Sequence, residues 1–194
     1  MAKLYFKYGA MGSSKSAQAL ITQFNYEELN MRVWLIKPGV DTRDGADIVK
    51  SRIGLTRSAY VITPEMNIID EYLASGHHDV IIADEAQFFE AQQINQMRHL
   101  VDAHNVPVLC FGLRTDFLTN MFPGSKRLME ISDSITEIKT VCSCGRKATV
   151  NARITPEGQI ITEGSQVFLG GSDSYIAMCH KCWHDKIAAQ ADEA

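Results

Sequence analysis

The segment at residues 9–16, GAMGSSKS, contains the residue types that bind a phosphate. Glycines let consecutive backbone N–H groups turn inward on an anion, a lysine reaches the β- and γ-phosphates, and a hydroxyl ligates Mg²⁺. Gly9, Lys15 and Ser16 fill three of the four required places, whereas Ser14 stands where the P-loop pattern has a glycine. An ordinary turn before a helix also fits so short a match, so a second element must support it.

A pair of adjacent acids is the second candidate. The apolar run at residues 80–83 ends in Asp84 and Glu85, followed by Ala-Gln-Phe. A hydrophobic strand that ends in acids downstream of a P-loop has the form of a Walker B element, in which Asp84 would help to hold Mg²⁺ and Glu85 could handle a proton. The alternative is a helix N-terminus with favourable acids, because residues 91–104 have a helical pattern. The order of the two segments favours a nucleotide site.

Four of the five cysteines lie in two close pairs, CSC at 142–144 and CHKC at 179–182. Four thiolates are the ligand set of a closed structural zinc site, although the first pair has one intervening residue where about two to four are usual. His180 and His184 are close enough to be rival ligands, and free cysteines in a reducing cell are the alternative. No acid that could be catalytic stands beside the pairs, so we predict a structural role. The predicted ligands are Cys142, Cys144, Cys179 and Cys182.

Strands and helices that alternate along the chain must position these groups. An alternating apolar run leads into the phosphate loop, and a helical pattern follows the loop to about residue 30. Strands separated by helices pair in parallel, and ligands bind beyond their carboxyl ends. The expected strands are 4–8, 33–36, 80–83, 107–113 and 135–141, and the expected further helices are 65–74, 91–104 and 125–132.

Two loops could add residues to such a site. The polar segment at 39–57 contains Asp41 and Arg43, and it is either a solvated loop or a source of an arginine that reaches the phosphates. The segment that follows the strand at 107–113 contains Phe117 and Phe122. These rings either pack under their own loop or line a ligand pocket.

Composition limits the class of protein. The chain has 194 residues and a formal charge of −4, with a pI of about 5.8, which argues against a surface that coats nucleic acid. No apolar run reaches the length of a signal peptide or a membrane span, so we expect a soluble, cytoplasmic protein with neither nucleic acid nor membrane as a partner. The expected division is a nucleotide-binding core at 1–140, a zinc-binding lobe at 141–187 and a disordered tail at 188–194.

Taken together, GAMGSSKS, DEAQFF, FGLRTDF, CSCGRKA, GGSDSY and CHKC resemble the type II thymidine kinases in order and spacing, over about residues 3–184. The resemblance implies an α/β fold, with a RecA-like P-loop core whose parallel sheet is flanked by helices, and a small C-terminal zinc-binding lobe. It implies that ATP, with Mg²⁺, phosphorylates the 5′-hydroxyl of thymidine. It also implies a homotetramer and feedback inhibition by thymidine triphosphate (dTTP).

The resemblance also assigns residues. It makes Glu85 the general base, places Asp84 at magnesium, and gives Gln87 and Arg43 places beside the phosphates. The implied phosphate loop is Gly9, Ala10, Met11, Gly12, Ser13, Ser14, Lys15 and Ser16. The implied nucleoside pocket is Met11, Phe88, Leu113, Phe117, Phe122 and Tyr175, with Gly170 and Gly171 in a lasso at 170–178 that closes over the base.

Two other functions fit parts of the sequence. In a P-loop ATPase, Glu85 would activate water, and ATP turnover would not depend on a nucleoside. In a nucleic-acid-binding module, the zinc lobe would bind a polynucleotide in a salt-sensitive way, which the acidic composition does not favour. The kinase is the interpretation that uses every motif.

Overall fold

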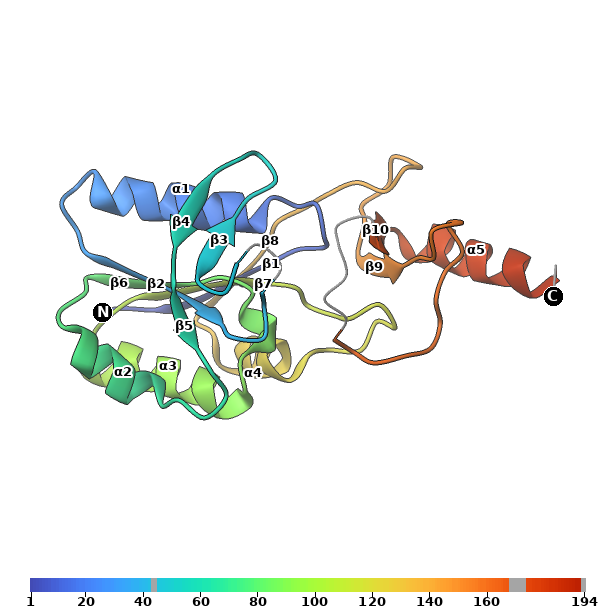
Figure 1. Ribbon diagram of the computed structural model, residues 1–194. Helices are drawn as coiled ribbons and strands as arrows, with labels where there is room; N and C mark the ends of the chain where they lie inside the picture. The colour runs from blue at the N-terminus through green and yellow to red at the C-terminus, as the bar shows by residue number, and fades with distance from the viewer. Residues whose placement is uncertain (43–44, 168–173, 193–194) are drawn as a thin grey trace.

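The computed structural model describes residues 1–42, 45–167 and 174–192. Its centre is a parallel sheet of six strands in the order β5-β2-β6-β7-β1-β8 (Figure 1). The strands are β1 (Leu4–Tyr8), β2 (Val33–Pro38), β5 (Tyr60–Ile62), β6 (Val80–Ala83), β7 (Val108–Gly112) and β8 (Ser134–Glu137). The predicted parallel sheet is therefore confirmed, and the carboxyl ends of its central strands meet at one edge.

Helices cover both faces of this sheet. Helix α1 (Lys15–Glu27) lies on one face, and α2 (Ile68–Ser75), α3 (Ala91–His104) and α4 (Pro123–Ile131) lie on the other (Figure 1). The side chains of the strands alternate between the two layers: Ile81 joins the core under α2 to α4, and its neighbour Ile82 joins the core under α1. Because alternate residues of a strand point to opposite faces, these near-continuous apolar strands supply both cores.

The polar segment at 39–57 is not the open loop that its composition allowed. It contains a short antiparallel hairpin, β3 (Ile48–Lys50) and β4 (Thr56–Ser58). Lys37 at the end of β2 is 1% exposed, and its ammonium donates hydrogen bonds to the carbonyls of Gly45 and Ile48 and pairs with the Asp41 carboxylate at 3.4 Å. A buried lysine with three partners thus fastens the hairpin to the sheet.

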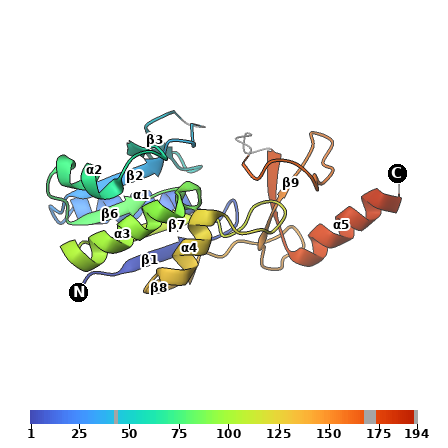
Figure 2. The same ribbon diagram turned by 90° about the horizontal axis from the view of Figure 1, so that it is seen from below.

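The C-terminal lobe lies beyond the carboxyl edge of the sheet (Figures 1 and 2). It consists of the antiparallel pair β9 (Val150–Arg153) and β10 (Tyr175–Met178), followed by α5 (His180–Asp192). Helix α5 is continuous through Asp192, so the tail predicted to be disordered from residue 188 is helical up to that point. Likewise, the strand predicted at 135–141 is β8, which ends at Glu137. Among the described residues, no helix combines the length and apolar character needed to cross a membrane.

Candidate active site

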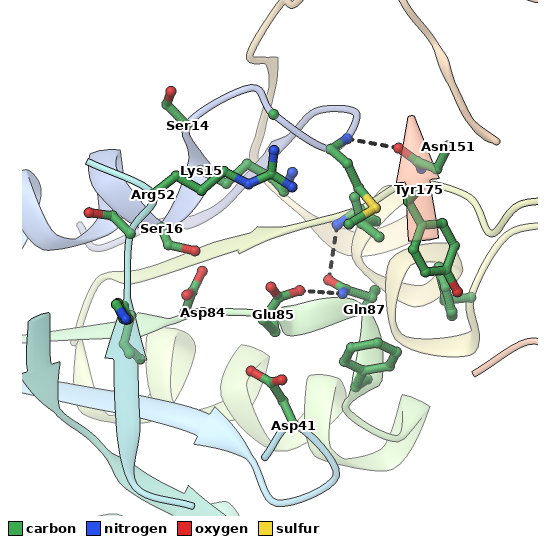
Figure 3. A pocket seen from close by; sticks show the side chains of 18 of the residues that line it. Ser14, Lys15, Ser16, Asp41, Arg52, Asp84, Glu85, Gln87, Asn151 and Tyr175 are labelled. Atoms are coloured by element: carbon green, nitrogen blue, oxygen red, sulfur yellow. Dashed lines mark hydrogen bonds between the residues drawn. The ribbon is translucent and has the colours of Figure 1, made fainter. Parts of the chain in front are cut away.

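A cavity of about 450 Å³ lies where the carboxyl edge of the sheet meets the C-terminal lobe. Figure 3 shows Lys15 and Arg52 on one side of it, facing the carboxylates of Asp84 and Glu85. The predicted residues that line it are Met11, Gly12, Ser14, Lys15, Ser16, Asp84, Glu85, Gln87, Phe88, Leu113, Phe117, Phe122 and Tyr175. Three other predicted residues, Arg43, Gly170 and Gly171, lie outside the described residues.

The phosphate loop connects β1 to α1 through a backbone that glycine alone accepts at its start. A Cβ on Gly9 would lie 2.3 Å from the carbonyl oxygen of Ile138, which forbids any side chain there. Further on, Gly12 has φ +77°, and Ser14 has φ 63° and ψ 30°, in the left-handed region. Ser14 therefore adopts a conformation that glycine reaches without cost and that serine rarely adopts.

The ammonium group of Lys15 lies inside the loop. It donates to the carbonyl oxygen of Ala10 at 3.0 Å and to the hydroxyl of Ser13 at 3.4 Å. Lys15 is also the first residue of α1, so its charge lies beside the backbone N–H groups that begin the helix. A lysine and a helix N-terminus that face one cavity favour an anion there.

Asp84 follows β6 and is buried, 4% exposed. Burial and then the charge of the adjacent Glu85 raise the pKa of Asp84 to about 7, whereas a hydrogen bond from the Ser16 hydroxyl and the charge of Lys15 act to lower it. A buried carboxylate whose charged form is disfavoured is suited to a bound cation, which would stabilise that charged form. The oxygens of Asp84 and Ser16 are of the kind that Mg²⁺ prefers, so the pair fits this ion.

Glu85 is held by its neighbours in a left-handed backbone conformation. It has φ 49° and ψ 39° and precedes the short helix η1 (Ala86–Phe88). The amide group of Gln87 donates to the Glu85 carboxylate at 2.5 Å, and its oxygen accepts the backbone N–H of Leu113 at 2.9 Å (Figure 3). A Cβ on Gly112 would lie 2.6 Å from that same oxygen. Gln87 thus fixes Glu85 relative to the end of β7, a link that the sequence motif alone did not predict.

Aromatic side chains form the part of the cavity away from the phosphate loop. The rings of Phe88 and Phe122 meet edge to face with their centroids 5.5 Å apart. Phe117 is buried, and the guanidinium of Arg153 lies 3.8 Å from the centre of its ring. Arg153 also donates to the hydroxyl of Tyr175 at 3.0 Å. These contacts hold apolar surface at the far side of the cavity, where a flat ring could bind.

The cavity is also lined by residues that were not predicted as site residues, among them Lys50, Arg52, Asn151 and Gln166. Lys50 and Arg52 belong to the segment at 39–57, which the sequence offered as a possible source of an arginine for the phosphates, but only Asp41 and Arg43 were singled out there. Asn151 carried a weak signal, because it is a polar residue in a short run, VNAR, that is otherwise suited to a strand. Asp41, which the sequence marked as a candidate beside Arg43, also lines the cavity.

The four predicted cysteines come together in the lobe. Their sulfur atoms all lie within 4.8 Å of one another, and neither His180 nor His184 joins them in the cluster found among the described residues. Hydrogen bonds from the backbone N–H groups of Cys144 and Cys179 lower the pKa of Cys142 to about 6. The pKa of Cys179 is lowered too, chiefly by a hydrogen bond from the backbone N–H of Cys182. Four clustered sulfurs, two of them with a lowered pKa, have the chemistry of a structural zinc site.

The fold and the cavity define a P-loop phosphotransferase, with a phosphate-binding loop, an acid that fits Mg²⁺ and a second carboxylate that faces an aromatic pocket. The family model described as thymidine kinase matches residues 2–183. The thymidine kinase of Enterobacteria phage T4 is 43% identical over 95% of this chain and 97% of its own length. Those of Haemophilus influenzae (strain ATCC 51907 / DSM 11121 / KW20 / Rd) and Legionella pneumophila (strain Lens) are 41% and 43% identical, over 96% and 92% of this chain and 98% and 88% of their own. The chain belongs to the thymidine kinase family.

Proposed function

We propose that the protein transfers the γ-phosphate of ATP to the 5′-hydroxyl of thymidine, giving thymidine 5′-monophosphate. The observation that carries this proposal is a cavity that has the phosphate loop at one side, the aromatic pocket at the other and Glu85 between them. Membership of the thymidine kinase family supports the same reaction. A phosphoryl group transferred from ATP at the phosphate loop to a nucleoside in the aromatic pocket would therefore pass beside Glu85.

The phosphate loop would bind the β- and γ-phosphates. Lys15 would leave its contacts with Ala10 and Ser13 and pair with the phosphate oxygens instead. Mg²⁺, when bound, would neutralise part of the charge of the triphosphate, and Ser16 and Asp84 would hold it. Arg43 is proposed to approach the same phosphates, on the basis of the family motif.

Glu85 would act as the general base. A carboxylate is too weak a base to deprotonate an alcohol in advance, so Glu85 would orient the 5′-hydroxyl and accept its proton late in the transfer. The hydrogen bond from Gln87 holds the carboxylate in place. The position of the Glu85 carboxylate would therefore contribute more to phosphoryl transfer than its basicity.

Base recognition would combine apolar contact with hydrogen bonds. Phe88, Leu113, Phe117 and Phe122 offer apolar surface for a pyrimidine and its 5-methyl group, and Tyr175 lines the same cavity. The lasso at 170–178, with Gly170 and Gly171, is proposed to pair with the base edge through its backbone and to exclude water. Thymine presents two carbonyl acceptors around an N3–H donor, whereas cytosine presents an amino donor and an unprotonated N3.

A panel of nucleosides at equal concentration, with radiolabelled ATP, tests the function. We expect thymidine to be phosphorylated best, deoxyuridine to be roughly 10- to 200-fold poorer for want of a methyl group, and deoxycytidine to be worse by about 10⁴-fold because its edge leaves buried groups unpaired. Comparable use of deoxycytidine would contradict recognition through the base edge. Equal ATP turnover with and without nucleoside would instead favour the ATPase, and salt-sensitive binding of a polynucleotide would favour the nucleic-acid-binding module.

We further propose a homotetramer that binds one structural Zn²⁺ in each chain and is inhibited by dTTP. Exposed apolar residues on and after α1 support self-association, namely Ile21, Phe24, Leu29 and Met31. The cavity supports inhibition by dTTP, because a thymine ring and a triphosphate both find matching groups there. Clustered free cysteines support a reducing, cytoplasmic location. Light scattering tests the homotetramer. Thymidine phosphorylation at increasing dTTP concentration tests the inhibition by dTTP.

A further inference from the structure

Asn151 connects the C-terminal lobe to the phosphate loop. Its side chain is buried, 3% exposed. The amide oxygen accepts the backbone N–H of Met11 at 2.8 Å (Figure 3), and the amide nitrogen donates to the backbone carbonyl of Thr115 at 2.9 Å. One side chain from the lobe therefore joins two loops of the kinase core, the loop after β1 and the loop after β7.

The position of Asn151 on β9 makes this connection rigid. Its neighbours Val150 and Ala152 are both fully buried, and Ala152 packs in the core of the lobe with two of the clustered cysteines. Asn151 and Arg153 point the other way, as alternate residues of a strand do. Arg153 contacts the ring of Phe117 and the hydroxyl of Tyr175, on the aromatic side of the cavity. Strand β9 thus extends one side chain toward the phosphate loop and another toward the aromatic pocket.

The phosphate loop needs such support because Ser14 is strained. Gly12 and Ser14 both have positive φ, which glycine adopts freely and serine does not. Sparsely populated conformations persist only where surrounding contacts determine them. The contact with Asn151 fixes the loop at Met11, shortly before Ser14. It also engages the Met11 N–H, so the N–H groups left to face a phosphate are those further along the loop.

We propose that Asn151 is a positioning residue for ATP, which holds the phosphate loop in its binding conformation from the C-terminal lobe. This inference deepens the proposed function and rests on the part of it that assigns ATP to the phosphate loop. It predicts that a substitution in the lobe, at a residue far from the phosphate loop in the sequence, weakens the binding of ATP itself.

The test is Asn151→Leu, which keeps the branching at Cγ with bulkier methyl groups and removes both hydrogen bonds. We expect the Kd for MgATP, measured by calorimetry without nucleoside, to rise about 5- to 50-fold, since loss of each buried hydrogen bond leaves a backbone group unpaired. The KM for ATP should rise in parallel, and more than the KM for thymidine. Zinc content and the melting temperature of the lobe report whether the lobe is still folded.

Arg153→Lys is the matched control, because it changes the next residue of β9 on the same side. It keeps the charge and loses the planar contact with Phe117, so we expect a higher KM for thymidine and a Kd for MgATP within about twofold of the unsubstituted protein. An unchanged ATP affinity in Asn151→Leu with a folded lobe would overturn the proposal, as would a loss confined to thymidine. Failure of the unsubstituted protein to phosphorylate thymidine is a separate result, because the ATP titration contains no nucleoside.

Discussion

Ser14→Gly should stabilise the protein. Ser14 has φ 63°, is exposed, and its side chain forms no capping hydrogen bond with α1. The Cβ of Ser14 therefore makes the left-handed conformation unfavourable, and no capping hydrogen bond from the side chain offsets that cost. Glycine would adopt the same φ and ψ with no such cost, because it has no Cβ.

The magnitude follows from two opposing terms. A non-glycine residue in the left-handed region costs about 1–2 kcal/mol. Glycine also gives the unfolded chain more conformational freedom. This lowers the free energy of unfolding by about 0.4–1 kcal/mol and so offsets part of the relief of strain. The net expectation is that the free energy of unfolding rises by about 0.5–1 kcal/mol. For a chain of this length, that change raises the melting temperature by roughly 1–4 °C.

Thermal unfolding of the ligand-free protein by circular dichroism measures the effect, with Ser14→Ala as the control. Alanine keeps the Cβ and hence the strain, so its melting temperature should not rise. Because glycine preserves the observed backbone, the Kd for MgATP should stay within about threefold in Ser14→Gly. Equal melting temperatures for the glycine and alanine variants would refute the claim that position 14 is strained. So would destabilisation by glycine.

Two further changes test the chemistry and the lobe. Glu85→Gln should reduce kcat by roughly 10²-fold or more while ATP still binds. The control is Glu28→Gln, at an exposed residue at the other end of α1, which should leave kcat unchanged. Near-normal turnover of Glu85→Gln when chemistry is rate-limiting would exclude Glu85 as the base. Cys179→Ser should lower zinc content from about one ion per chain and speed hydrogen exchange in α5 more than in the sheet, and active protein that is free of zinc would contradict the structural role of the cysteines.

The parts of the fold that the sequence predicted are those dictated by local pattern. Strands such as β6 and β7 are short, continuous apolar runs, which is typical of a parallel sheet buried on both faces. Helix α3 was recognised from its periodicity, and the structure adds the capping box between Glu90 and Gln93 at its start. Once the strands are parallel, the phosphate loop and the acids after β6 must share one edge of the sheet.

The parts that it did not predict depend on contacts between distant segments. The hairpin of β3 and β4 has strands of three residues each, and it is held by the buried ammonium of Lys37, which no composition rule would place inside a protein. Arg52 reaches the cavity only because of that hairpin. The role of Asn151 likewise depends on a contact between β9 and the phosphate loop, which are 140 residues apart in the chain.

The backbone of the site also departs from what its residue types prefer. Among the described residues, five other than glycine have positive φ, and two of these, Asn30 and Asn105, are asparagines, which tolerate that region. Ser14 and Glu85 have no such preference, and both line the cavity. Ser14 directly precedes Lys15 at the start of α1, and Glu85 lies just after β6, so each left-handed residue lies at or beside a charged side chain that lines the cavity. A glycine substitution would have different consequences at the two positions. Glycine at 14 would relieve the strain and keep the loop. Glycine at 85 would relieve the same kind of strain but remove the carboxylate that the proposed reaction needs.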